Sequence, residues 1–110
     1  MSEASIVVVL VTASGLEEAR RIGRALVEER LAACASLLPG VTSVYRWEGR
    51  LRQEDEQLLL VKARRTDVER LAARVRALHS YDVPEVIALD VVDGAAPYLA
   101  WVREATARDD

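Results

Sequence analysis

The sequence is poor in the side chains from which metal sites and nucleophilic sites are usually built. Its 110 residues include one cysteine, one histidine and one lysine, and neither asparagine nor phenylalanine. With Cys34 alone no intrachain disulfide can form, so we expect a reducing, cytoplasmic compartment. Cys34, His79 and Met1 are too few soft donors for a tetrahedral zinc or copper site within one chain. Any Ser-His-acid triad would have to include His79.

Further absences exclude whole classes of protein. The five glycines are scattered and form no Gly-rich phosphate loop. The apolar run at residues 6–11 is too short to span a bilayer and follows no basic residue, so we predict neither a membrane protein nor a secretory signal. The net charge of -3, from 15 basic and 18 acidic residues, argues against nucleic-acid binding through phosphate contacts.

What is present is enough apolar sequence for one globular domain, residues 1–110, because 51% of the residues are hydrophobic. A β-branched run predicts a strand over 5–12. Apolar residues at helical spacing then predict a helix from an N-cap at Ser14, with Glu17 as its capping-box partner, to about residue 33.

The middle of the chain predicts a long hairpin. A second strand begins near Cys34, is kinked by Pro39-Gly40 and continues over 41–47. Glu48-Gly49 is a turn signal, and a third strand follows over 51–64. These arms are longer than the first strand, so we expect the tip of the hairpin to overhang the domain.

The last third of the chain predicts a helix, a strand and a closing helix. Thr66 or Asp67 caps the helix, and His79 lies in its last turn. Pro84 ends the helical region, and residues 85–92 form a fourth strand. A short helix from residue 96 to about 107 carries Pro97 in its first turn.

The order of these elements predicts an α+β, ferredoxin-like βαββαβ fold with a C-terminal helix. Such a fold is a two-layer sandwich: an antiparallel four-stranded sheet with two helices on one face. Residues 6–11, 58–61 and 86–89 are apolar without alternation, which indicates strands with apolar side chains on both faces. Two helices cover only one face, so we expect another subunit to cover the second.

The densest polar cluster is His79-Ser80-Tyr81-Asp82-Val83-Pro84-Glu85, at a helix-to-strand junction. It has the side chains of a ligand or metal pocket. The same residues also suit ordinary helix termination, with Asp82 bonding local backbone and Pro84 starting the strand, and chemistry alone favours that role.

Other conspicuous side chains have two interpretations each. Lys62 is the one lysine beside fourteen arginines. Either a compact charge on a flexible side chain is needed at this position, or the lysine occurs there by chance. Cys34 is interpreted as a buried small hydrophobic residue. Tyr45 and Trp47 form either an aromatic wall or, by preference, a packing or subunit contact. Tyr98 and Trp101 of the last helix are interpreted in the same way, as a docking face.

Several segments taken together resemble the CutA family, the divalent-cation tolerance proteins, and the resemblance extends from residue 5 to about 103. The segments are 33–35 (Ala-Cys-Ala), 39–49 (Pro-Gly-Val-Thr-Ser-Val-Tyr-Arg-Trp-Glu-Gly), 58–62 (Leu-Leu-Leu-Val-Lys), 79–88 (His-Ser-Tyr-Asp-Val-Pro-Glu-Val-Ile-Ala) and 98–101 (Tyr-Leu-Ala-Trp). The combination is specific, whereas no one segment is.

The resemblance implies a ferredoxin-like homotrimer, similar in architecture to the PII signalling proteins, with inward-facing sheets and hairpins that pair with neighbouring subunits. It implies a role in tolerance to copper and other divalent ions, with copper bound by some members, no required cofactor and no established catalysis. It also implies a ligand pocket near the subunit clefts. The pocket residues carried over from the family are Lys62, His79, Tyr81, Asp82 and Glu85.

The sequence departs from the family pattern at several positions. Ser80 stands where proline is common after the histidine, Ala63 where threonine often follows the lysine, and Ser36 where asparagine is common. Val11 and Leu78 occupy the places of an extra cysteine and a second histidine in some bacterial members. Copper binding through those extra donors is therefore not implied here.

We expect a cytoplasmic trimer that acts as a binding or signalling module rather than an enzyme. A weak divalent-metal site, strongest for Cu²⁺, is predicted at His79 with Asp82 or Glu85. The alternative is a small-molecule enzyme that uses the intersubunit pocket with His79 or Lys62 as its acid-base group. A purely structural scaffold is a third possibility.

Overall fold

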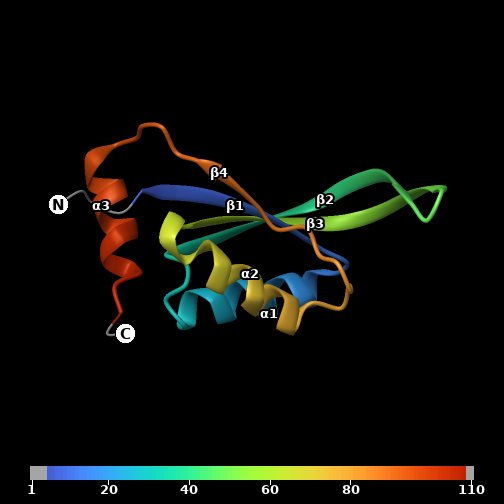
Figure 1. Ribbon diagram of the computed structural model, residues 1–110, viewed down its shortest axis with the longest axis horizontal. Coiled ribbons are helices and arrows are strands. Elements are labelled where there is room, and N and C mark those ends of the chain that lie inside the picture. The colour runs from blue at the N-terminus through green and yellow to red at the C-terminus, as the bar shows by residue number, and fades with distance from the viewer. Residues whose placement is uncertain (1–4, 109–110) are drawn as a thin grey trace.

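A computed structural model, which describes residues 5–108, places two helices against one face of a long, twisted sheet (Figure 1). The elements in chain order are β1 (Ile6–Ala13), α1 (Leu16–Glu28), β2 (Cys34–Trp47), β3 (Arg50–Arg64), the 3-10 turn η1 (Arg65–Asp67), α2 (Val68–Leu78), β4 (Ile87–Asp90) and α3 (Ala96–Ala105). The strands are antiparallel neighbours in the order β2-β3-β1-β4. The predicted ferredoxin-like fold with a C-terminal helix is confirmed.

The core lies between the sheet and the helices. Val9 of β1 and Val61 of β3 are opposite each other in the sheet and fully buried, against Ile22 and Leu26 of α1 and Leu71 of α2. α3 packs separately at the end of the sheet away from the hairpin tip (Figure 1). None of the helices within residues 5–108 is long and apolar enough to cross a membrane.

The other face of the sheet, here called the open face, is also apolar. One row across the four strands runs Leu89, Val8, Lys62 and Cys34, and the next begins at Ile87 and Leu10. The Leu89 and Ile87 side chains are each 50% exposed in the single chain. α3 covers only one end of this face, where Ile6 packs against Val102 and the Arg64 side chain bonds Thr106. The covering of the rest of the face by another subunit stays a prediction.

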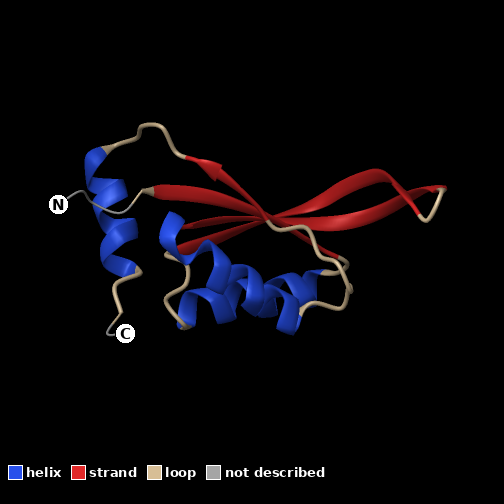
Figure 2. Cartoon of the chain, in the orientation of Figure 1, coloured by secondary structure: helices blue, strands red, loops and turns tan. Residues whose placement is uncertain are grey.

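β2 and β3 form the predicted hairpin, which extends well beyond the helices (Figure 2). The kink at Pro39-Gly40 is a bulge within one continuous strand, because the register shifts between Leu38 and Val41. Glu48 and Gly49 at the tip both have positive φ, 49° and 77°, as a two-residue turn of the I′ type requires.

The first helix ends earlier than predicted. α1 stops at Glu28, because Arg30 adopts a left-handed conformation with φ of 60°. The Leu31 N–H then bonds Leu26 O at 2.9 Å and the Arg30 N–H bonds Val27 O at 3.1 Å, the hydrogen-bond pattern of a Schellman motif. This motif turns the chain and buries Leu31 in the core.

The predicted cap of α1 is wrong, and that of α2 is right in position only. The N-cap of α1 is Gly15 rather than Ser14, and Glu18 rather than Glu17 reaches back to Ser14. Asp67 is the N-cap residue of α2 but makes no side-chain cap, since its carboxylate pairs with Arg108 at 2.7 and 3.0 Å.

The remaining predicted boundaries shift by a few residues. α3 ends at residue 105 rather than near 107, and His79 follows the last turn of α2 in an extended conformation. β4 covers 87–90 rather than 85–92, because only these residues pair with β1.

Candidate functional site

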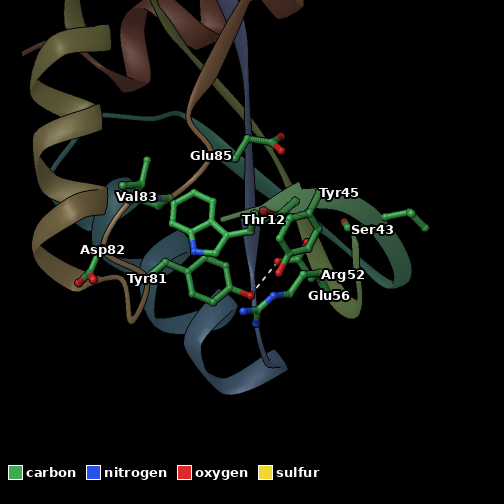
Figure 3. A pocket seen from close by; sticks show the side chains of 12 residues that line it. Thr12, Ser43, Tyr45, Arg52, Glu56, Tyr81, Asp82, Val83 and Glu85 are labelled. Carbon is green, nitrogen blue, oxygen red and sulfur yellow. Dashed lines mark hydrogen bonds between the residues drawn. The ribbon is translucent and has the colours of Figure 1, made fainter. Parts of the chain in front are cut away.

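A hollow of about 690 Å³ lies between the base of the hairpin and the loop that joins α2 to β4. The hairpin contributes residues 43–45 and 47 of β2 and, from β3, Arg52 and Glu56. Residues 81–85 of the loop form the opposite wall, and Thr12 of β1 lies between (Figure 3). We call this hollow the hairpin pocket.

The loop is held against the hairpin by Tyr81. Its hydroxyl donates a 2.8 Å hydrogen bond to Oε2 of Glu56, drawn as the dashed line in Figure 3. Burial and the neighbouring Glu56 carboxylate, which accepts this bond, raise the pKa of the Tyr81 phenol. Tyr81 therefore acts as a neutral hydrogen-bond donor in this position.

The His79 imidazole fastens the start of the same loop to β1. Its Nδ1 accepts the backbone N–H of Tyr81 at 3.0 Å, and Nε2 lies 2.6 Å from the carbonyl oxygen of Thr12. A nitrogen that accepts carries no proton, so Nδ1 is bare and Nε2–H donates to Thr12. Both ring nitrogens are thus in use.

Glu18 joins the loop to the start of α1. One carboxylate oxygen accepts the Ser80 N–H at 2.8 Å, and the other accepts the N–H and hydroxyl of Ser14 at 3.3 and 3.2 Å. Burial by itself would raise the pKa of Glu18, but the hydrogen bonds from Ser80 and Ser14, with nearby His79, together lower it. Glu18 is therefore an ionised structural group.

Two acidic side chains lie inside the hairpin pocket. Glu56 is only 6% exposed, and Glu85 is partly buried. Burial, followed by the charge of Glu56, raises the pKa of Glu85. No ion pair to either carboxylate occurs within residues 5–108. The two more exposed charges of the pocket, Arg52 and Asp82, belong to its rim.

Three of the five predicted pocket residues are brought together, and two are not. Tyr81, Asp82 and Glu85 line the hairpin pocket, whereas His79 lies behind Tyr81, with ring centroids 4.6 Å apart. Lys62 lies elsewhere on the open face, where its Nζ donates to the Ser36 hydroxyl at 2.9 Å. Its role in a ligand site stays a prediction.

Sequence reasoning missed Glu56 and Arg52 as pocket residues. Both belong to the polar first half of β3. Arg52 is the register partner of Tyr45, and Glu56 lies on the same face as Arg52 because alternate residues of a strand share a face. That alternation was a signal available in the sequence. Tyr45 and Trp47, for which packing was preferred over an aromatic wall, do line the pocket.

The predicted metal ligands do not form a site within one chain. Among residues 5–108 no group of three or more His, Cys, Asp or Glu side chains is placed to hold a metal ion. Both nitrogens of His79 are hydrogen bonded, and the Asp82 and Glu85 carboxylates point apart in Figure 3. Metal binding through these residues stays a prediction that needs a second subunit or a local rearrangement.

Comparison with known proteins identifies the family. Residues 7–105 match the family model described as CutA1 divalent ion tolerance protein. The divalent-cation tolerance protein CutA of Thermus thermophilus is 52% identical over 99 residues, 90% of this chain and 96% of that protein. Human protein CutA is 44% identical over 93% of this chain, which spans only 57% of the human protein.

Solved structures agree with this assignment. The structure of the Thermus thermophilus divalent cation tolerance protein superimposes with a TM-score of 0.91 and 50% identity, covering 93% of this chain and 99% of that one. CutA1 from Oryza sativa superimposes with a TM-score of 0.92 and 40% identity, covering 96% and 97% of the two chains. On sequence and fold together, the chain belongs to the CutA1 family of divalent ion tolerance proteins.

Proposed function

We propose that the chain is one subunit of a cytoplasmic homotrimer that serves divalent-cation tolerance as a binding or signalling module, with the hairpin pocket as its ligand site. Membership of the CutA1 family supports the role in cation tolerance. The single cysteine supports a reducing compartment.

The apolar open face is the main observation in support of the proposed trimer. Leu38, Ile87 and Leu89 are 42%, 50% and 50% exposed in one chain, on a face that also carries Val8 and Leu10. Burying an exposed side chain of this size stabilises an assembly by roughly 1 kcal/mol or more, since a full burial contributes about 1.5–3 kcal/mol. The outer strands β2 and β4 also have unpaired backbone groups at the sheet edges, which a neighbouring subunit can pair.

Light scattering on the purified chain tests the assembly. We expect a mass three times the 12.2 kDa of one chain. Leu89→Glu places a charge on the open face and should dissociate the trimer, whereas Ala77→Glu places the same charge on an exposed position of α2 and should not. A monomeric wild-type protein, or equal behaviour of the two variants, would contradict the proposal.

For metal we propose weak binding, with Cu²⁺ preferred among the first-row divalent ions. His79 would be the nitrogen ligand, with Asp82 or Glu85 from the same or a neighbouring subunit. A cation at Nδ1 must displace the Tyr81 N–H, and one at Nε2 must displace Thr12 O. Either displacement costs a hydrogen bond, which is why the affinity should be low.

Copper calorimetry at pH 7.5 on the wild-type protein and His79→Ala tests this site. A lower affinity in the variant supports His79 as a ligand. Equal affinity in both would remove His79 from the site. A proton at the imidazole competes with metal, so binding should weaken as the pH falls.

Catalysis has less support than binding. Lys62 does not line the hairpin pocket, and the His79 nitrogens are both occupied, so neither predicted acid-base group is free to exchange a proton with a ligand there. A saturable turnover that disappears in His79→Ala would favour the enzyme instead.

A further inference from the structure

We propose that the hairpin pocket selects a small organic cation, such as an amine, over neutral and anionic molecules of the same shape. This inference rests on the proposed binding function and specifies the class of ligand. Three observations carry it: the aromatic walls, the hydrogen bonds of their hydroxyls and the distribution of charge with depth.

The walls of the pocket are rich in aromatic rings. Tyr45 and Trp47 alternate along β2 and therefore project from the same face of the hairpin, while Tyr81 comes from the facing loop. The ring contacts of residues 5–108 are His79 with Tyr81 and Tyr98 with Trp101, so Tyr45 and Trp47 have no ring partner in the described chain. They are 37% and 45% exposed. The electron-rich face of such a ring attracts a cation.

The hydroxyl groups of both tyrosines are turned toward carboxylates. Tyr81 donates to Glu56 at 2.8 Å, and Tyr45 donates to Glu54 at 3.3 Å. A phenol that donates to an anion gains electron density in its ring, which strengthens attraction between the ring and a cation. Each bond also directs the polar O–H away from the ring face.

Negative charge lies deeper in the pocket than positive charge. Glu56 is buried and Glu85 half-buried, without an ion-pair partner among residues 5–108, whereas Arg52 and Asp82 are exposed. The lining residues carry three carboxylates and one guanidinium. An ammonium group between the deep carboxylates would relieve their repulsion, which adds to burial in raising the pKa of Glu85.

The same geometry disfavours other ligands. A bare metal ion needs several donors at one point, and no such cluster is formed within residues 5–108. An anion would meet Arg52 at the rim but two carboxylates below it. A wholly apolar ligand would leave the two deep carboxylates without a counter-charge. An organic cation satisfies both the rings and the carboxylates.

Three probes of matched shape test the inference: cyclohexylammonium, cyclohexanol and cyclohexanecarboxylate. Trp47 fluorescence reports binding in a Trp101→Phe background, because Trp47 and Trp101 are the two tryptophans of the chain. We expect the ammonium compound to bind at least tenfold more tightly than the other two. Three results would overturn the inference: equal affinities, tighter binding of the carboxylate, or no binding of any probe. The probes are tested up to about 50 mM, which is near the weakest affinity worth measuring.

Glu85→Gln removes a deep charge while keeping the shape of the side chain. It should weaken cyclohexylammonium binding about fivefold to tenfold and leave cyclohexanol binding unchanged. Glu104→Gln, an exposed position on α3, is the matched control and should change neither. Light scattering on the same samples separates the two proposals. An intact trimer without cation preference refutes this inference alone, whereas a monomer refutes the proposed assembly.

Discussion

The Tyr81 hydroxyl and the Glu56 carboxylate, 2.8 Å apart, connect the loop after α2 to the base of the hairpin. Glu56 is 6% exposed, so its carboxylate depends on this donor more than on solvent. The same bond therefore serves stability and positions the aromatic wall of the pocket.

Tyr81→Phe should lower the free energy of unfolding by about 1–3 kcal/mol, because it leaves a buried carboxylate without its donor. Urea unfolding at one fixed protein concentration measures the loss. Combining the change with Glu56→Gln should cost less than the two single losses added together. Strict additivity would show that the two side chains do not interact, and Tyr98→Phe on α3 is the control for loss of a phenol hydroxyl.

Glu18 should contribute to the loss of folding stability at acid pH. Its folded pKa is lowered, so the unfolded state takes up the proton first and the stability that Glu18 contributes is lost as the pH falls through its folded pKa. Glu18→Gln should be less stable at pH 7 and should lose less stability than wild type between about pH 5 and pH 3. Urea unfolding across this range measures both effects. Identical pH slopes in the two proteins would contradict the prediction, and exposed Glu17→Gln is the neighbouring control.

His79 should be found as the Nε2–H tautomer, because Nδ1 accepts the Tyr81 N–H. Nitrogen chemical shifts of the imidazole at neutral pH report the tautomer directly. His79→Gln keeps a donor that can reach Thr12 O, so it should cost less stability than His79→Ala. A proton on Nδ1, or equal losses in both variants, would show that the bonds to Thr12 and Tyr81 are not formed as described.

Cys34 should react slowly with a thiol reagent in the native assembly. It lies in the same row of the open face as Leu89, on the opposite edge strand, and the proposed trimer covers this face. Leu89→Glu should therefore speed the reaction as it dissociates the trimer, and denaturant should speed it in every variant. A fast reaction in native wild type would indicate that Cys34 is accessible and that this row is uncovered.

Local sequence patterns were sufficient to predict most of the fold. Strand runs, helical spacing and the Glu48-Gly49 turn act over a few neighbouring residues, and they predicted the element order and the hairpin correctly. The end of α1 was missed because Arg30 adopts the left-handed conformation without being glycine. β4 was shortened because strand length depends on a partner strand that the local sequence does not contain.

For the site, the sequence by itself determined the chemical inventory: one histidine, one lysine, and Tyr81, Asp82 and Glu85 in one short segment. Only the tertiary structure decided which of these meet. Sheet register placed Lys62 opposite Cys34, where it reaches the Ser36 hydroxyl outside the pocket. The loop between α2 and β4 brought Tyr81 to Glu56 of β3. The physical reason is range, since composition and periodicity act along the chain, whereas a pocket is made by contacts between residues that are distant in it.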